Sequence, residues 1–571
     1  MTEFMKTQNS FADGEVSAEF FIRDNLNGLS RLENMDVIAG GGLRRRRGLQ
    51  SFATLNSSGR LIPFSVSESE NYLLALIDGH LKIYNNSELV RDLLVIWDFA
   101  DIEKIQYAQR FGTMLFVHPD YRPYVLTKTD SGFQLSEFAF EVNDADMFEN
   151  MPFMKFDDAT GVKITVTKNS AGNNYATFTT NKDFWRADNV GTRIMLLDKQ
   201  WQITEYTSPT VVTAYTNSQY TLPSKPVSDW SESAFSARRG WPCSITFHQD
   251  RLVFGGSKSW PSGIWMSCVG RHNNFNVGTG LDDEAIFLTL ISEQRQQICT
   301  VVSSDNLQIL TNVGEWAISS KPLTPSVVDV KQHTAVGSVA SRYLPPQKIE
   351  GATVFISNTE KDIRELSLDA LGENYNARDL CAASKHLMNT PIDLSYNEDT
   401  RQLYVVMING DMATLNQNSA LGISAWARYK TAGQFKSVAT IGGVTYVIVQ
   451  RGEEYCLERF SDDALNDADS YDFAYTAASL PLHASGHNVR TFRIRKISAR
   501  ILNTKTLFIN GTRVEFPNEI YASYSNGYTG DVSVNLLGTN HNGTVAPWVI
   551  SSDEQFPATI LSVSMSGSYM V

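Results

Sequence analysis

The sequence predicts an all-β fold: a β-propeller of about six or seven blades with an inserted small β-barrel or sandwich domain and an extended N-terminal arm. Short apolar runs alternate with polar residues and end at Gly, Asn, Asp or Pro, which is the pattern of β-hairpins. Equivalent hairpin positions recur every 43 to 54 residues, about the length of one four-stranded blade. Aromatic residues make up 11% of the 571 residues and 37 are glycine, which favours strands and turns over a helical bundle.

The chain is acidic overall. Its 62 acidic and 49 basic residues give a formal net charge of −13. Affinity for a phosphate backbone depends on Lys and Arg, so this charge argues against a chain that grips nucleic acid along its whole length. It is compatible with a surface that DNA passes without sticking. The 42% hydrophobic and 19% charged residues allow a substantial core and argue against global disorder.

The cysteines and the N-terminal residues bear on the compartment. The five cysteines are odd in number, widely spaced and never in a C-x-x-C pair. This pattern predicts reduced, mostly buried thiols, with no disulfide framework and no zinc site. The first residues lack the apolar stretch of a secretory signal, and the chain has no apolar run of about 18 residues. We therefore expect a protein that folds in the cytoplasm and has no membrane-spanning segment.

Residues 1–50 are expected to form an arm. They contain too few apolar residues for a core of their own, so the arm should pack against the main body or another subunit. Leu26, Leu29 and Leu32 have helical spacing, which predicts a short amphipathic helix.

The arm ends in a run of four arginines: Arg44, Arg45, Arg46 and Arg47. Such a run is typical of a solvated or partner-facing patch, and we regard all four residues as candidates for contact with a partner. Direct contact with DNA, or with an acidic partner surface, is the sharper alternative.

The first blades are assigned to residues 51–144. Two apolar runs joined by Asp78-Gly79 predict a hairpin there, because these residues suit a tight turn. Residues 145–237 change character: their closely spaced strands predict a small β-barrel or sandwich, inserted between blades.

The remaining blades are assigned to residues 238–462. Leu380, Ser384 and Leu387 interrupt this series with helical spacing, which predicts one helix. After about Ser461 comes the acidic, turn-rich stretch DDALNDADSYD, which is expected to be a linker. Residues 463–571 are again strand-like, and they either close the ring or form a separate tip domain.

The densest carboxylate group of the central stretch is Asp282-Asp283-Glu284. An acidic loop is the default interpretation, because adjacent carboxylates do not readily supply the alternating ligands of a calcium site. A general acid–base pair formed by Asp282 and Glu284, as in a glycosidase, is the alternative. Six tryptophans are expected to anchor the core, although they could also line a sugar site: Trp230, Trp241, Trp260, Trp265, Trp316 and Trp426. The sequence has no metal-ligand spacing, phosphate-binding loop or nucleophile elbow, so we expect no cofactor, no metal and no catalysis.

Several segments, in order, resemble a known family. They are QNSFADGEVS and GGLRRRRG near the start, then FVHPDYRPYVL, HQDRLVFGGS, DDEAI, LTNVGEWAIS, RDLCAASKHL, AWARYKTAGQFKSV and EEYCLERF. Together they span roughly residues 8–460. This series resembles the tail nozzle, or tail tube, proteins of short-tailed bacteriophages and related prophages.

The resemblance implies a structural protein of the virion tail, folded in the host bacterial cytoplasm. Members of the family form a ring, usually a homohexamer, that extends the DNA-ejection channel below the portal and its adaptor ring. Tail fibre or needle proteins are further implied partners, and the genome passes through the lumen without sequence-specific binding. The arm would contact the adaptor or a neighbouring subunit. The alternative function is a tail-associated propeller that binds or hydrolyses glycans of the host envelope.

Overall fold

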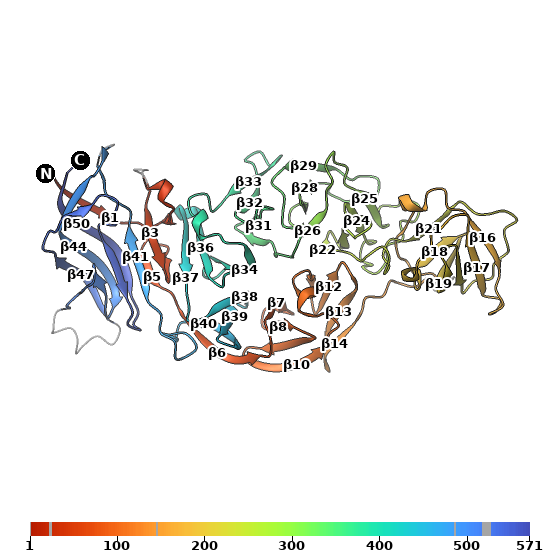
Figure 1. The fold of residues 1–571 in the computed structure, drawn as a ribbon, viewed down its shortest axis with the longest axis horizontal. Helices are drawn as coiled ribbons and strands as arrows, with labels where there is room; N and C mark the ends of the chain where they lie inside the picture. The colour runs from red at the N-terminus through yellow and green to blue at the C-terminus, as the bar shows by residue number, and fades with distance from the viewer. Residues whose placement is uncertain (1, 22–25, 144–146, 485–486, 517–526, 571) are drawn as a thin grey trace. The chain divides into compact units, whose positions relative to one another are not determined.

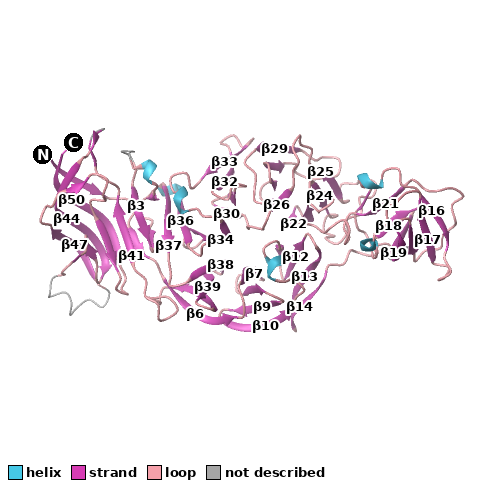
Figure 2. Ribbon diagram, viewed as in Figure 1, coloured by secondary structure: helices cyan, strands magenta, loops and turns pink. Residues whose placement is uncertain are grey.

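Strands make up most of the computed structural model, with only short helical turns between them (Figure 2). The structure describes residues 2–21, 26–143, 147–484, 487–516 and 527–570. They divide into two compact units, Met1–Ile102 with Leu344–Val571, and Glu103–Tyr343. Among the described residues, no helix is long and apolar enough to cross a membrane.

The first unit contains four antiparallel blades of four strands, one of which continues into a ten-stranded sheet with strands from both ends of the chain (Figure 1). The last of them is completed by β6, from near the N-terminus, which pairs with β40. The strands are β7 (Gly59–Ser65), β8 (Asn71–Ile77), β9 (His80–Asn85) and β10 (Glu88–Leu94); β30 (Gln347–Ile349), β31 (Ala352–Ile356), β32 (Ile363–Leu368) and β33 (Tyr375–Asp379); β34 (Pro391–Asn397), β35 (Gln402–Met407), β36 (Met412–Asn418) and β37 (Ile423–Tyr429); β38 (Gln434–Ile441), β39 (Val444–Arg451), β40 (Glu454–Ser461) and β6 (Gly48–Leu55).

The second unit contains three blades and the inserted sheet. The blade strands are β11 (Gln106–Arg110), β12 (Thr113–His118), β13 (Tyr121–Thr129) and β14 (Gly132–Glu137); β22 (Ser244–His248), β23 (Arg251–Gly255), β24 (Gly263–Met266) and β25 (Ile286–Thr289); β26 (Ile298–Ser303), β27 (Leu307–Thr311), β28 (Glu315–Ile318) and β29 (Val330–Thr334). The prediction of an all-β propeller of six or seven blades is confirmed, because seven four-stranded meanders follow one another along the chain.

The second strand of a blade is buried on both faces. In β8, β23, β31 and β35 nearly every side chain is buried, so the usual alternation of buried and exposed residues disappears. Within the second unit, for example, the blade β22–β25 packs against β11–β14 on one side and against β26–β29 on the other, which explains the continuous apolar runs in the sequence. The predicted hairpin at Asp78-Gly79 joins β8 to β9, and Gly79 has a φ of 69°, which glycine adopts without strain.

The inserted sheet has seven strands in the order β15-β21-β18-β19-β20-β17-β16. They are β15 (Phe153–Met154), β16 (Ile164–Lys168), β17 (Tyr175–Thr180), β18 (Arg193–Leu196), β19 (Lys199–Ser208), β20 (Val211–Tyr215) and β21 (Trp230–Ser233). It encloses a core of its own, in which Trp185, Trp201 and Trp230 pack against Phe178 and Phe184.

The N-terminal residues and the C-terminal segment fold together. β1 pairs with β50, β5 also pairs with β50, and β3 pairs with β41. The N-terminal strands are β1 (Thr2–Gln8), β2 (Gly14–Glu15), β3 (Gly28–Glu33), β4 (Met35–Val37) and β5 (Leu43–Arg45). The C-terminal strands are β41 (Tyr475–Ser479), β42 (His483–Ala484), β43 (His487–Asn488), β44 (Thr491–Thr504), β45 (Phe508–Ile509), β46 (Thr512–Arg513), β47 (Tyr528–Asn535), β48 (His541–Asn542), β49 (Val549–Ser552) and β50 (Thr559–Met570).

These strands belong to two sheets that enclose one hydrophobic core. Leu29, Leu32, Leu43, Trp548 and Ile560 are among its buried residues. The expected arm therefore packs within its own chain, as an integral part of a β domain. The closing strand of the last blade is β6, and the described residues after 462 supply none of the blade strands.

Two helix predictions are wrong. Leu29 and Leu32 lie on β3, where a β-bulge between Leu29 and Arg31 shifts the register, so that residues three apart both face the core. Around Leu380 the backbone extends the sheet, because its amide donates to the carbonyl of Ile363. Only a 3-10 turn, Lys385–Leu387, follows. The other helical turns are α1 (Phe99–Ile102) and the 3-10 turns Ala18–Phe20, Asp157–Ala159, Ala187–Asn189 and Ser419–Leu421.

Candidate functional site

The arginine run lies at the joint between the β domain and the last blade, and its four side chains differ in exposure. Arg44 is exposed, Arg47 is half-buried, and Arg45 and Arg46 are 6% and 1% exposed. The interpretation of the run as a solvated or partner-facing patch is therefore wrong for Arg45 and Arg46. The reason is strand geometry: β5 points successive side chains to opposite faces, and the chain between β5 and β6 continues into the interior.

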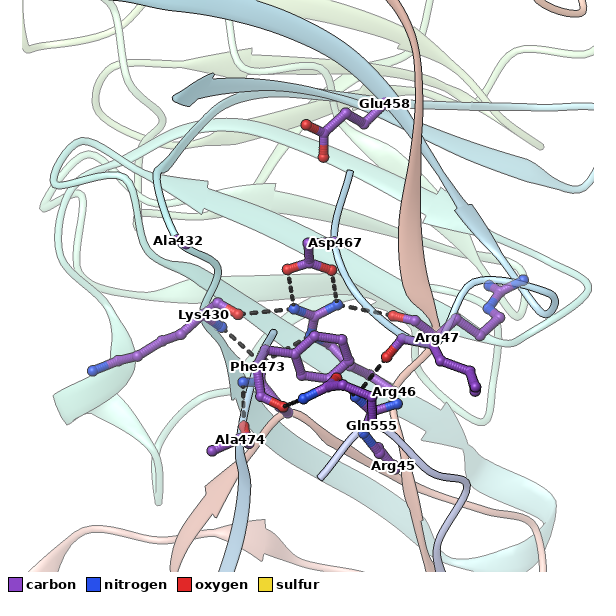
Figure 3. A network of polar contacts seen from close by, with 12 residues as sticks. Arg45, Arg46, Arg47, Lys430, Ala432, Glu458, Asp467, Phe473, Ala474 and Gln555 are labelled. Atoms are coloured by element: carbon purple, nitrogen blue, oxygen red, sulfur yellow. Dashed lines mark hydrogen bonds and ion pairs between the residues drawn. The ribbon is translucent and has the colours of Figure 1, made fainter. Parts of the chain in front are cut away.

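Every nitrogen of the Arg46 guanidinium donates a hydrogen bond within the protein (Figure 3). Its guanidinium donates to both carboxylate oxygens of Asp467, at 2.9 and 2.7 Å. It also donates to the side-chain oxygen of Asn34 at 2.9 Å and to the carbonyls of Lys430 and Arg47 at 2.9 and 2.8 Å. A bidentate pair with additional acceptors is the arrangement that offsets the desolvation of a buried ion pair.

Arg45 and Arg46 both stack on Phe473. Their guanidinium carbons lie 4.0 and 3.6 Å from the centre of the ring. Arg45 also donates to the carbonyl of Leu465 at 2.7 Å and to the side chain of Gln555. Burial, followed by the charge of Arg46, lowers the pKa of Arg45 to about 10. The acidic stretch interpreted as a linker thus supplies partners of the arginines through Leu465 and Asp467, and Phe473 follows it directly.

A second polar centre surrounds Glu15, which sequence reasoning did not single out. Its side chain is fully buried. The carboxylate accepts from the amide of Leu32 at 2.7 Å and from the Arg428 guanidinium, and it lies 2.8 Å from Nε2 of His386. The Ser384 hydroxyl donates to the Glu15 carbonyl at 2.6 Å. Burial acts to raise the pKa of Glu15, but the hydrogen bonds from His386 and Arg428, with the charge of Arg428 and the Leu32 amide, lower it below its usual value.

Gly14 explains why this centre can form. Its φ is +61°, and a Cβ there would lie 2.4 Å from the carbonyl oxygen of Trp426. Only glycine therefore lets β2 pair against β37. The Trp426 indole in turn donates to the carbonyl of Leu380 at 2.9 Å. The available sequence signal was an acidic residue directly after a glycine. This signal indicates a tight backbone contact and does not by itself indicate a catalytic group.

The acidic cluster Asp282-Asp283-Glu284 forms an exposed turn. One carboxylate oxygen of Glu284 accepts from the amides of Thr279, Gly280 and Leu281, at 2.7, 2.5 and 2.8 Å. The amide of Leu281 is the largest cause of a lowered pKa for Glu284.

The buried Arg251 also holds this turn, through hydrogen bonds to its backbone. Its guanidinium donates to the carbonyls of Asp282 and Glu284, at 2.8 and 2.6 Å. The turn is thus held by its own backbone, and the Glu284 carboxylate points back into it, which supports the interpretation as a structural loop.

Among the described residues, the side chains of Asp362, Asp379 and Cys381 lie close enough together to hold a metal ion. Lys385 occupies the place of a cation there, with its ammonium 2.8 Å from Asp362 and 3.2 Å from Asp379. Burial raises the pKa of the Cys381 thiol to about 12, which disfavours the thiolate that a metal needs. These residues do not fit a metal ion.

Comparison with known proteins adds little. No family model matches the sequence, and no curated protein matches it. Solved structures with some similarity include BamB from Moraxella catarrhalis, with 12% identity over 73% of this chain and 100% of that one, at a TM-score of 0.32. They also include the β-propeller domain of Cps50 (Swd1) from Myceliophteria thermophila, with 9% identity over 72% and 99% of the two chains, at 0.34. BBS1N in complex with ARL6DN matches with 9% identity over 73% and 99%, also at 0.34.

Proposed function

We propose that this chain is a structural component of a bacteriophage virion, the subunit of a tail nozzle. In this proposal about six copies form a ring below the portal and its adaptor, and the ring extends the channel through which DNA is ejected. Tail fibre or needle proteins would attach to it. The subunit would fold in the host cytoplasm, carry no cofactor and catalyse no reaction.

The observation that carries the proposal is the contact set of Glu15. Three of the segments that resemble the nozzle family lie far apart in the sequence, around Glu15, His386 and Arg428. All three meet at the buried carboxylate of Glu15, which His386 and Arg428 contact from the surface side. Contacts of this kind hold distant strands together, which is what the wall of a channel requires.

Two further features support the same role. β6, which precedes the first blade in the sequence, pairs with β40 of the last blade. This pairing covers the edge of β40, so the last blade has fewer unpaired strand edges. The net charge of −13 suits a channel that DNA must leave without binding.

The oligomeric state tests the ring. Mass photometry of the purified chain, alone and with particles that lack it, should detect an assembly of about six times the 63.7 kDa chain mass. Electron microscopy of virions carrying a tagged copy, with the tag in the exposed turn at Gly172, should place the label on the tail. Monomers alone inside purified virions would contradict the proposal.

Arg44 offers a sharper test of partner contact than the whole run. It is the exposed member, whereas changing all four arginines would also break the buried pairs. We expect Arg44→Glu to fold normally and to impair assembly onto the tail. Arg91→Glu, an exposed arginine on β10, is the matched control and should assemble as the wild type does. Equal assembly of both variants would remove Arg44 as a contact residue.

A glycan-binding propeller is the second candidate, favoured by one hollow of about 440 Å3 in the second unit. Trp260, Asp157, Ser259, Ser262 and Thr289 are among the residues that line it. An aromatic ring beside hydroxyl and carboxylate groups is suited to a sugar. If glycans bind there, Trp260→Ala should abolish retention on host envelope polysaccharide, while replacement of Asp282, Asp283 and Glu284 by their amides should not.

A further inference from the structure

A cavity of about 450 Å3 lies in the second unit, at the starting ends of the first strands of three successive blades. Gln106 begins β11, Cys243 immediately precedes β22, and Cys299 follows the first residue of β26. Because these strands belong to three different sheets, the cavity is built by their packing and not by one loop. Its volume lies within the range of small-molecule sites, roughly 300–1,000 Å3.

The floor of the cavity, formed by Gln106, Cys243 and Cys299, carries no charge. Burial raises the pKa of both thiols, Cys243 and Cys299, to about 12, so both stay protonated. The Gln106 side chain is 5% exposed, and its Nε2 donates to the carbonyl of Cys299 at 2.6 Å. This bond assigns the other atom, Oε1, as an acceptor, and Oε1 is buried with no hydrogen-bond partner among the described residues. A buried acceptor without a partner is costly unless a water or a ligand donates to it.

One wall is the segment from Val339 to Tyr343, which connects β29 to the next blade. The Tyr343 amide donates to the carbonyl of Glu103 at 2.7 Å, and the Tyr343 ring meets Tyr107 edge to face, with 6.0 Å between the ring centres. The Cys299 thiol donates to the carbonyl of Ser338 at 3.5 Å. The wall is therefore held at both ends by the blades it passes.

The rim is cationic. Lys104, Lys258, Arg295 and Arg342 line it, against a single carboxylate, Asp120. Asp120 forms an ion pair with Lys258. Lys104 and Arg295 are exposed and have no ion-pair partner within the described ranges. Basic residues thus outnumber the one carboxylate at this hollow, although the chain as a whole has a net charge of −13, and such a rim attracts anions.

We propose that this cavity binds a phosphate ester that also carries a hydroxyl group. Lys104 and Arg295 hold the phosphate oxygens at the rim, since a guanidinium matches an oxyanion with two parallel hydrogen bonds. The hydroxyl donates to Oε1 of Gln106 on the floor. The phosphate ester is either a free phosphorylated metabolite or part of a nucleic-acid strand. The proposal does not depend on the proposed nozzle function.

The test uses the purified full chain and isothermal titration at about 50 mM salt, where surface electrostatics are less screened. AMP is the probe, and adenosine is its uncharged match. We expect AMP to bind and adenosine to bind at least tenfold more weakly. Absence of AMP binding at millimolar concentration, or equal binding of AMP and adenosine, would overturn the proposal.

Variants of opposite sign separate binding from misfolding. Lys104→Gln with Arg295→Gln should weaken AMP binding about tenfold, because two unpaired charges are lost. Asp120→Asn should strengthen it about threefold, because the charge of Lys258 is released. Lys168→Gln with Arg91→Gln removes two exposed charges elsewhere and should change nothing. An unchanged affinity in the first double variant, or weaker binding in Asp120→Asn, would contradict the site.

A further arm distinguishes the two sources of phosphate. A ten-nucleotide oligodeoxythymidine with a 3′-hydroxyl should displace AMP if the cavity accepts the phosphate of a strand. If the oligonucleotide binds without displacing AMP, or does not bind, the site is one for free phosphate esters. In both cases the AMP result stands on its own.

Discussion

Arg46 and Asp467, which are 421 residues apart, form a bidentate ion pair in which both side chains are fully buried. The pair connects the N-terminal strands to the segment that follows the last blade. Phe473 covers the guanidinium, and Asn34 and Lys430 supply further acceptors. A run of arginines that looks like surface in the sequence is thus a joint inside the protein.

Removal of one member of this pair should destabilise the protein strongly. We expect Arg46→Ala to lower the free energy of unfolding by ~3–5 kcal/mol, because Asp467 would remain buried without a partner. Urea denaturation followed by fluorescence measures this difference. Arg44→Ala is the matched control and should cost less than about 0.5 kcal/mol, because Arg44 is exposed.

Replacement of both Arg46 and Asp467 tests whether the unpaired charge causes the loss of stability. Arg46→Met with Asp467→Leu leaves no unpaired charge, so it should recover more than half of the stability lost in Arg46→Ala. If the double variant were as unstable as the single one, the surrounding acceptors and not the ion pair would dominate.

Glu15 should contribute to the pH dependence of stability. Its pKa is lower in the folded protein than in the unfolded chain, so its contribution is complete above the unfolded pKa and is lost as the pH falls through the folded pKa. Glu15→Gln should therefore lower stability at pH 7, by ~2–4 kcal/mol, and should lose less stability than the wild type between pH 5 and about pH 3. Urea midpoints across this range measure the difference. The exposed Glu453→Gln should follow the wild-type curve.

The N-terminal strands should be required for folding of the β domain. Deletion of residues 2–47 removes six apolar side chains from the core of this domain: Phe11, Leu29, Leu32, Met35, Val37 and Leu43. At ~1.5–3 kcal/mol each, their loss is comparable to the whole stability of a typical domain, about 5–15 kcal/mol. We expect the shortened protein to be insoluble, or to bind a dye that reports exposed apolar surface. Deletion of residues 2–8 alone removes the mostly exposed β1 and should leave a soluble protein. A soluble, cooperative 2–47 deletion would show that these strands form a dispensable arm.

Glu284 should protect the amides of its own turn. In Glu284→Gln, hydrogen exchange at residues 279–281 should become several-fold faster, because a neutral acceptor holds the three amides less strongly than a carboxylate. Asp283→Asn in the same turn should leave these rates unchanged. Slower exchange in Glu284→Gln would contradict the structural interpretation of the cluster.

Local patterns predicted the blades because the blade is a local structure. Strands such as β8 and β9 pair with their sequence neighbours, so apolar runs and turn residues at Asp78-Gly79 were sufficient to place them. The same reasoning failed at Leu29 and Leu32, where a bulge imitates helical spacing. It also could not assign a partner to Arg46, because charge patterning along a chain does not indicate which carboxylate, hundreds of residues away, shares its interior.

The sequence by itself determined the strand class, the blade repeat and the series of segments that resemble the nozzle family, all of which depend on spacing over at most about fifty residues. Tertiary structure alone decided that β6 closes the last blade, that β1 and β5 pair with the C-terminal strand β50, and that Arg46 and Glu15 are buried. The physical reason is that strand pairing and charge burial depend on which distant surfaces meet. Three well-separated segments must be in place before Glu15 has its partners, and Arg46 and Asp467 stand at almost opposite ends of the chain.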